Sequence, residues 1–115
     1  MADVATHVWT GASGKKYTYG VYKLPITFTE CDGNYIFTKL NEQNQHVPIY
    51  FGEGALRDRC SDKHHKIACI TVKGATHVHC HQNSDEQNRC DEEQDLLAAH
   101  PEAYIRTGCN EKEGG

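Results

Sequence analysis

Two tyrosines, each separated from a glycine by one residue, are the first side chains whose spacing suggests chemistry. The triplets Gly33-Asn34-Tyr35 and Tyr50-Phe51-Gly52 bracket a segment with the composition of a β-hairpin. After a turn, a short helix is expected to carry Arg59. Two phenols and a guanidinium could then converge at one end of the sheet. The alternative interpretation of the tyrosines is a buried aromatic pair.

A carboxylate on the last predicted helix is the second candidate. Projection at 100° per residue makes Cys90, Leu96 and Leu97 the apolar arc and puts Glu93 close to its centre. A buried carboxylate is costly unless it is paired or binds a metal ion. An ion pair with Arg89, one turn earlier, is the structural alternative. The same projection turns Glu92 and Asp95 toward solvent.

Three histidines alternate along a predicted strand. His77, His79 and His81 would share one face of it. Successive positions on that face are about 6.8 Å apart, which is too far for all three to reach one zinc ion without distortion. A polar sheet face is therefore favoured over a metal site.

The elements that must position these residues form a mixed pattern. β-branched and aromatic residues predict strands over 18–24, 35–40 and 47–51, with a turn at 31–34 and glycines that end the hairpin. A short helix is expected over 55–60, and strands over 67–72 and 76–82. A capping box begins a longer helix at Ser84, and Pro101 ends it. The prediction is an α+β domain: a small, mainly antiparallel sheet with a β-hairpin, flanked by short helices.

Length and composition set limits on the class of protein. The 115 residues fit a single domain, 1–115, with an N-terminal extension over 1–16 and a disordered tail over 111–115. Net charge is −4, but residues 55–83 carry five basic and two acidic side chains, so an anionic ligand would meet the chain there. Ordinary scatter of surface charge is the alternative explanation. Without a signal-peptide pattern, a cytoplasmic protein is expected, with all six cysteines reduced.

In order along the chain, these features resemble the GIY-YIG nuclease domain. That family has a Gly-x-Tyr strand, a Tyr-x-Gly strand, a Leu-x-x-Arg helix and a later helix with a metal-binding glutamate. The corresponding residues here are Gly33 and Tyr35, Tyr50 and Gly52, Leu56 and Arg59, and Glu93. The match covers about residues 32–110. The histidine that often follows the arginine corresponds to His64, with His65 beside it, and Asn110 corresponds to the family's late asparagine.

The resemblance implies a metal-dependent endonuclease that hydrolyses DNA phosphodiester bonds one strand at a time. Glu93 would hold one divalent ion, Mg²⁺ or Mn²⁺, and Arg59 would clamp a phosphate oxygen. Tyr50 would be the general base, with its pKa depressed by Arg59 and the metal, and Tyr35 would orient phosphate or water. His64 is the alternative proton acceptor. Two rival hypotheses remain: a catalytically silent domain of this fold that binds nucleic acid or protein, and a histidine-cysteine zinc module.

Overall fold

Five antiparallel strands form a curled sheet in the computed structural model, which describes residues 5–104 and 106–111. The strands lie in the order β1-β2-β5-β3-β4. Their bounds are Thr6–Thr10 (β1), Lys16–Lys23 (β2), Asp32–Leu40 (β3), His46–Ala55 (β4) and His77–Gln82 (β5). The predicted α+β class and the hairpin of β3 and β4 are confirmed. Strand β1 lies within the segment 1–16, for which the sequence predicted no strand.

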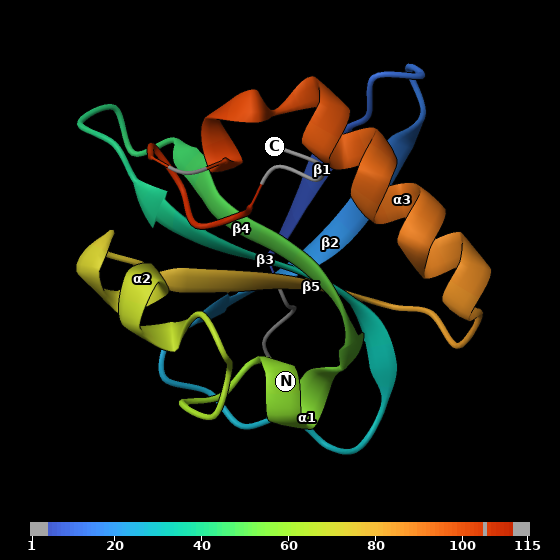
Figure 1. Ribbon diagram of the computed structural model, residues 1–115, viewed down its shortest axis with the longest axis horizontal. Coiled ribbons are helices and arrows are strands. Elements are labelled where there is room, and N and C mark those ends of the chain that lie inside the picture. Colours follow the sequence, from blue (N-terminus) through green and yellow to red (C-terminus); the bar gives the residue numbers. More distant parts are fainter. Residues whose placement is uncertain (1–4, 105, 112–115) are drawn as a thin grey trace.

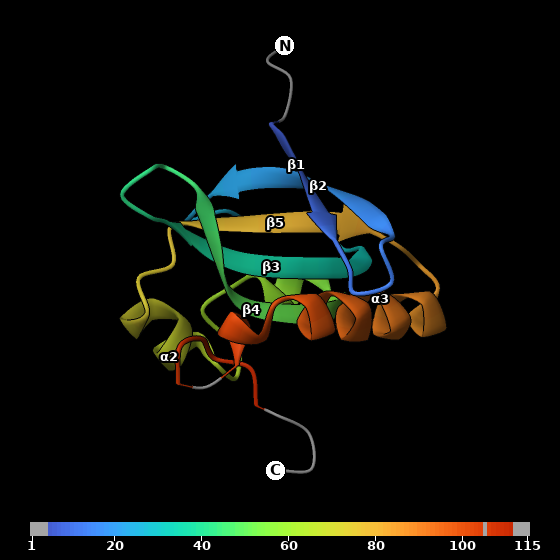
Figure 2. The same cartoon turned by 90° about the horizontal axis from the view of Figure 1, so that it is seen from above.

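Helices cover both faces of the sheet. Figure 1 looks at the sheet from its β4 edge, with α3 on one side of the strands and α1 on the other. Figure 2 shows the five strands following one another, with the helices gathered near β4. The helices are α1 (Leu56–Arg59), α2 (Ile67–Val72), α3 (Glu86–Ala99) and the 3₁₀ turn η1 (Pro101–Ala103).

Successive side chains of a strand point to opposite faces of the sheet, and apolar side chains form a layer on each face. Tyr35, Phe37 and Val78 face α1 and α2, where Leu56 and Ile70 complete a buried cluster. On the opposite face, a second cluster packs under α3 and η1; its buried members are Trp9, Tyr19, Ile36, Phe51, Leu96, Leu97 and Ala103. The sheet is thus buried on both faces near β3, which fixes the register of the central hairpin.

The segment Ile67–Val72 is a helix, and the predicted strand is wrong. A strand would put Ile70 and Val72 on the same face, but Ile70 is buried whereas Val72 is 83% exposed. Helical geometry separates the two side chains, so that only Ile70 enters the core. Gly74, with φ of +88°, follows the helix and ends it. A six-residue apolar run fits either structure, and packing decided between them.

Strand boundaries also differ from the predictions. Asp32, Gly33 and Asn34 belong to β3 rather than to a turn, because their backbones pair with Ala55, Gly54 and Glu53. The glycines at 52 and 54 therefore lie inside β4 and do not end it. Helix α3 begins after Asp85, whose carboxylate accepts from the Asn88 amide, so the cap is one residue later than predicted.

Not all cysteines are free. Cys69 on α2 and Cys109 in the C-terminal segment form a disulfide, which corrects the prediction of six reduced thiols. The four free cysteines are Cys31, Cys60, Cys80 and Cys90. Forty positions separate the paired cysteines, and nothing in the local sequence indicates that α2 and the C-terminal segment meet. In the described ranges, no helix is long and apolar enough to cross a membrane.

Candidate active site on the β3–β4 hairpin

Tyr35 and Tyr50 lie on the same face of adjacent antiparallel strands, as predicted. Tyr35 is opposite Gly52 and Tyr50 is opposite Phe37, so the two phenols are diagonal neighbours. Their rings are stacked with centroids 6.1 Å apart. A Cβ atom at Gly52 would lie 2.3 Å from the Tyr35 ring. The glycine of the second triplet therefore makes room for the tyrosine of the first.

His64 holds the Tyr35 hydroxyl group from the loop after α1. The backbone amide of Lys66 donates to His64 Nδ1 at 2.9 Å, and Nε2 lies 2.6 Å from Tyr35 Oη. Since Nδ1 is an acceptor, the proton of the neutral ring is on Nε2 and is donated to Tyr35. Burial, with the positive charges of His65 and Arg59, lowers the His64 pKa to about 4, so the ring is neutral at pH 7. His64 therefore orients Tyr35, whose own hydroxyl proton is directed elsewhere.

Arg59 reaches the same end of the hairpin, and its neighbour Arg57 does not. Gly54 has φ of +133°, and a Cβ there would lie 3.1 Å from Arg59 Nε, so the side chain passes directly over the glycine. The positive charge of Arg59 opposes the upward shifts in the pKa of Tyr50 and of Glu93. Arg57 Nη1 instead lies 4.0 Å from Glu30 Oε2 in an exposed ion pair.

Glu93 lies where α3 meets the edge strand β4. Burial, aided by the nearby Glu53 carboxylate, raises the Glu93 pKa to about 7, although Arg59 acts in the opposite direction. The alternative considered for Glu93, an ion pair with Arg89, is not formed. Arg89 Nε donates to Glu53 Oε1 at 2.9 Å, and Arg89 Nη1 donates to the Asn83 carbonyl. Glu93 thus keeps a half-buried carboxyl group that its surroundings only partly compensate.

This donor set is compatible with a hydrated magnesium or manganese ion. Mg²⁺ is commonly held by one or two carboxylates and retains several water ligands. A cation beside Glu93 would offset the two effects that raise its pKa, namely burial and the charge of Glu53. Glu93 is the side chain that fits a metal-binding role.

A hollow of about 300 Å³ opens beside the tyrosines. Its lining residues are Ala55, Asp58, Arg59, Lys63, His64 and His65. Arg59 and Lys63 give it two full positive charges against the one negative charge of Asp58. Two of the five basic side chains of the segment 55–83 therefore lie at this hollow.

Without a metal ion, Arg59 alone does not depress the pKa of Tyr50. Burial and the charge of Glu93 raise the pKa of Tyr50 above its ordinary value of 10, and Arg59 only partly opposes them. Burial likewise raises the pKa of Tyr35. In the metal-free protein both phenols are neutral hydrogen-bonding groups at pH 7.

Asn110 supports the second triplet from the C-terminal segment. Phe51 donates its amide proton to Asn110 Oδ1 at 2.8 Å, and Asn110 Nδ2 donates to the Phe51 carbonyl at 2.9 Å. The asparagine therefore occupies the free edge of β4 between Tyr50 and Gly52, as another strand would. Its role was foreseeable only through the family resemblance, because Asn110 is distant in sequence from the hairpin.

Two acidic residues of α3 differ from the prediction. Glu92 is 4% exposed rather than solvent-facing, and it accepts hydrogen bonds from Tyr19 and from His81 Nδ1. Asp95 is half-buried and accepts from Ser13 and Tyr17. The buried residues of α3 are thus Arg89, Glu92, Leu96 and Leu97. A projection of apolar residues finds the two leucines and overlooks Arg89 and Glu92 because these are charged.

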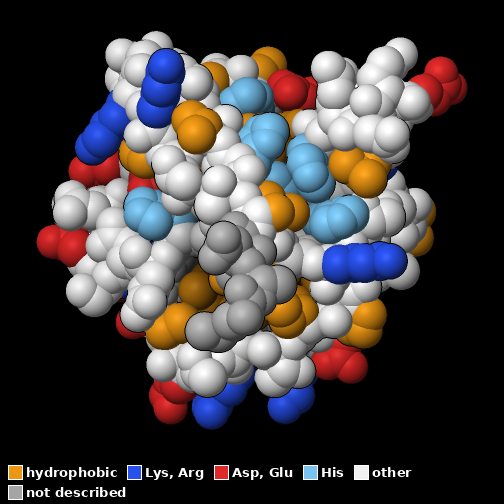
Figure 3. Space-filling model, turned by 180° about the vertical axis from the view of Figure 1, so that it is seen from behind, with side chains coloured by type: hydrophobic (Ala, Val, Ile, Leu, Met, Phe, Trp, Pro, Cys, Tyr) orange, Lys and Arg blue, Asp and Glu red, His pale blue; other side chains and the backbone are white. Residues whose placement is uncertain are grey.

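The three alternating histidines share a face, as predicted, but serve different neighbours. His79 Nδ1 accepts from the Trp9 indole at 3.0 Å, whereas His81 is bound to Glu92. Histidine side chains gather on the rear of the molecule (Figure 3); those in mutual ring contact are His7, His46, His77 and His79. Within residues 5–104 and 106–111, no group of three His, Cys, Asp or Glu side chains is arranged to hold a metal ion.

Comparison of the chain with protein-family models, with curated proteins and with solved structures finds no match. The functional interpretation therefore depends on the geometry of the hairpin end.

Proposed function

We propose that this protein is a metal-dependent endonuclease of the GIY-YIG type that hydrolyses DNA phosphodiester bonds. The main support for this proposal is that five side chains, from β3, β4, α1, the following loop and α3, lie near one end of the β3–β4 hairpin. They are Tyr35, Tyr50, Arg59, His64 and Glu93. Phosphoryl chemistry needs a charge clamp, a metal-binding carboxylate and a group that orients water, and this set contains each of them.

The hollow beside α1 is the proposed position of the scissile phosphate. Arg59 offers forked N–H donors that match two oxygens of a phosphate, and Lys63 adds a point charge at the same opening. As negative charge develops on the phosphate oxygens, the Arg59 guanidinium stabilises it with little reorganisation, because its stem already lies over Gly54.

Glu93 would hold the divalent ion. Bound Mg²⁺ or Mn²⁺ supplies positive charge that stabilises the departing oxygen and the phosphate. The chain's own contribution is a carboxylate that is half-buried and deprotonated above about pH 7. Binding of a cation favours the ionised carboxyl group and extends this range to lower pH.

The two phenols would orient and deprotonate the attacking water. His64 donates to the Tyr35 oxygen, so the Tyr35 hydroxyl group can donate its own proton to Tyr50 or to a phosphate or water oxygen. Tyr50, which packs against the Tyr35 and His64 rings, is the proposed proton acceptor. It would act as a phenolate after its own proton has passed to solvent, a form that Arg59 and a cation held by Glu93 would favour. Arg59 acts against the burial that raises its pKa. His64 is the weaker candidate, since its Nδ1 lone pair is already used by the Lys66 amide.

The test is an assay of purified protein on supercoiled plasmid, single-stranded DNA and branched DNA, with Mg²⁺, with Mn²⁺ and with a chelator. Metal-dependent nicks are expected. If folded protein binds DNA but leaves all three substrates intact with both metals, the enzyme proposal is wrong and the catalytically silent binding module replaces it.

A further inference from the structure

We propose that the Cys69–Cys109 disulfide is a redox-exchangeable link that holds the candidate site in its ordered geometry, so that thiol reductants loosen the edge strand carrying Tyr50. The effect on cleavage rests on the proposed nuclease function. The structural effect does not, because it concerns the backbone of β4.

The first link runs from the disulfide to β4. The Cys109 amide donates to the Ile49 carbonyl at 2.8 Å, and the next residue, Asn110, makes two hydrogen bonds to the Phe51 backbone. β4 is the edge of the sheet, and these backbone groups of Ile49 and Phe51 point away from β3. The C-terminal segment therefore provides their partners on both sides of Tyr50.

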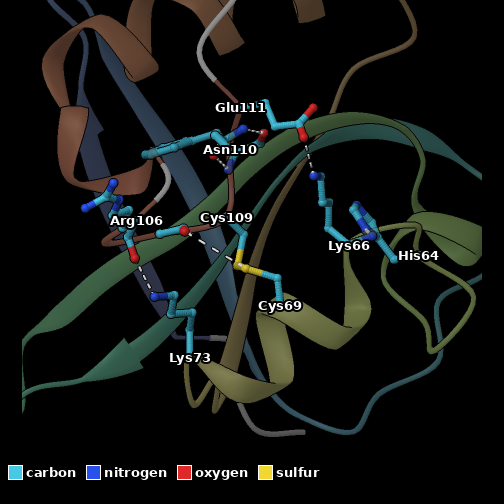
Figure 4. The surroundings of a disulfide bond; sticks show 10 residues. His64, Lys66, Cys69, Lys73, Arg106, Cys109, Asn110 and Glu111 are labelled. Atoms are coloured by element: carbon cyan, nitrogen blue, oxygen red, sulfur yellow. Dashed lines mark hydrogen bonds and ion pairs between the residues drawn. A yellow bond between two sulfur atoms is a disulfide. The ribbon is translucent and has the colours of Figure 1, made fainter.

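The second link runs to the loop that carries His64. Lys66 Nζ lies 2.9 Å from Glu111 Oε1, and the Lys66 amide donates to His64 Nδ1. In Figure 4 the disulfide lies between α2 and the C-terminal segment, with His64 and Lys66 on the loop beside it. Oxidation of one cysteine pair thus tethers the segment that contacts β4 and the loop that positions Tyr35.

Apart from the disulfide, the side-chain contacts that join the segment to α2 and the loop before it are exposed or partly exposed. Lys73 Nζ donates to the Arg106 carbonyl on the exposed surface, and the Lys66–Glu111 pair is also partly exposed. Exposed pairs contribute little free energy. The covalent link keeps Asn110 at high effective concentration beside Phe51, and that advantage is lost when the link opens.

The exchange chemistry requires two thiols from a reductant such as a dithiol. A thiolate attacks Cys69 Sγ, the half-buried partner, and the S–S bond breaks with Cys109 leaving as a thiolate that takes up a proton. The second reductant thiol displaces Cys69 from the mixed disulfide. Two electrons pass to the protein, which gains two thiols, and the reductant becomes a disulfide.

Amide hydrogen exchange of the full chain, measured by NMR with and without dithiothreitol, tests this inference. Reduction should speed exchange of the Phe51 amide roughly tenfold, the factor expected for loss of one hydrogen bond's net contribution. Exchange of the Val78 amide, in the interior strand β5, should not change. The double variant Cys69→Ser/Cys109→Ser should behave like the reduced parent under both conditions. Cys90→Ser, which removes a half-buried free thiol, should behave like the parent.

Two results would overturn the proposal. One is an unchanged Phe51 exchange rate on reduction. The other is equal acceleration at Val78, which would mean that the disulfide stabilises the whole fold and not β4 in particular. Plasmid nicking measured on the same samples should fall about tenfold on reduction. If no sample nicks DNA while Phe51 responds and Val78 does not, the redox link stands and the nuclease proposal fails.

Discussion

Glu93 has an environment that stability alone does not explain. Burial and Glu53 raise its pKa to about 7, and the nearby Arg89 is committed to Glu53. A glutamate retained for packing would have a partner that fully offsets the cost of burying its charge, and Arg59 does so only in part. We interpret the Glu93 carboxyl group as poised for a cation, at a cost to the stability of the metal-free protein.

Replacing Glu93 by Gln should therefore stabilise the metal-free protein at pH 8. The folded-state pKa is raised above the unfolded value of 4.5, so the folded state binds more protons between pH 4.5 and 7, and stability falls as pH rises through this window. Removing the charge should recover roughly 1–2 kcal/mol at pH 8 and almost nothing at pH 4. Urea unfolding at the two pH values measures the difference. A Glu93→Gln protein that is less stable than its parent at pH 8 would show that the carboxylate has a structural partner.

The two arginines of α1 should differ sharply in function. Arg59→Ala removes the guanidinium over Gly54 and should slow DNA nicking by about 10²-fold or more, with little change in the unfolding midpoint. Arg57→Ala removes one exposed ion pair and should have little effect. Single-turnover nicking rates for both variants decide the matter. An inactive Arg57→Ala protein beside a fully active Arg59→Ala protein would mean that the site is assigned to the wrong side of α1.

At the scale of elements, the β3–β4 hairpin depends on glycine at position 52. The Tyr35 ring lies where a side chain at this position would begin. His64 restrains that ring from the other side, so it cannot move away freely. Position 52 must therefore be glycine because the Tyr35 ring occupies the space that a larger side chain would need.

Gly52→Ala should destabilise the protein by about 1–3 kcal/mol, because the new methyl group overpacks a closed site. Gly20→Ala, on the same face of the sheet, is the matched control, since its Cβ would lie 3.2 Å from the half-buried Tyr22. Thermal unfolding should show a clearly larger loss for Gly52→Ala. Equal losses in the two variants would contradict a specific Tyr35–Gly52 contact.

At the scale of the whole molecule, local sequence patterns were sufficient to predict most of the helices and strands. Features that depend on contacts between distant segments were not predicted. The hairpin, the helix at Arg59 and the shared histidine face follow from alternation and spacing within a few residues. The helix Ile67–Val72, the buried Glu92 and the Cys69–Cys109 pair depend on what packs against them from distant segments. Asn110 reaches Phe51 across 59 residues. Such pairings are set by tertiary structure, and no local propensity encodes them.

Buried neutral histidines should make the fold sensitive to acid. Burial lowers the pKa of His79 to about 3 and that of His64 to about 4, and it also lowers those of His7 and His46. The unfolded chain takes up these protons near pH 6.5 and the folded chain only at lower pH, so stability falls as pH decreases from 6.5 toward 4. Each group contributes up to about 1.4 kcal/mol per pH unit within its window.

The opposite contribution of Glu93 is removed by measuring in the Glu93→Gln background. Urea midpoints at pH 7, 5.5 and 4.5 should decline steadily, and His64→Gln should flatten the decline more than His65→Gln, which changes an exposed ring. A pH-independent midpoint across this range would show that the histidines titrate normally in the folded protein.

The most direct test of the central claim is the rate of plasmid nicking by the parent, Glu93→Gln and Glu86→Gln proteins in Mn²⁺, with a chelator control. Glu86 lies exposed on the first turn of the same helix, so its substitution removes the same charge without touching the candidate site. Metal-dependent nicking is expected from the parent and from Glu86→Gln, with a rate at least about 10²-fold lower for a fully folded Glu93→Gln protein. Equal nicking by the parent and Glu93→Gln, or nicking that persists in the chelator, would contradict the central claim.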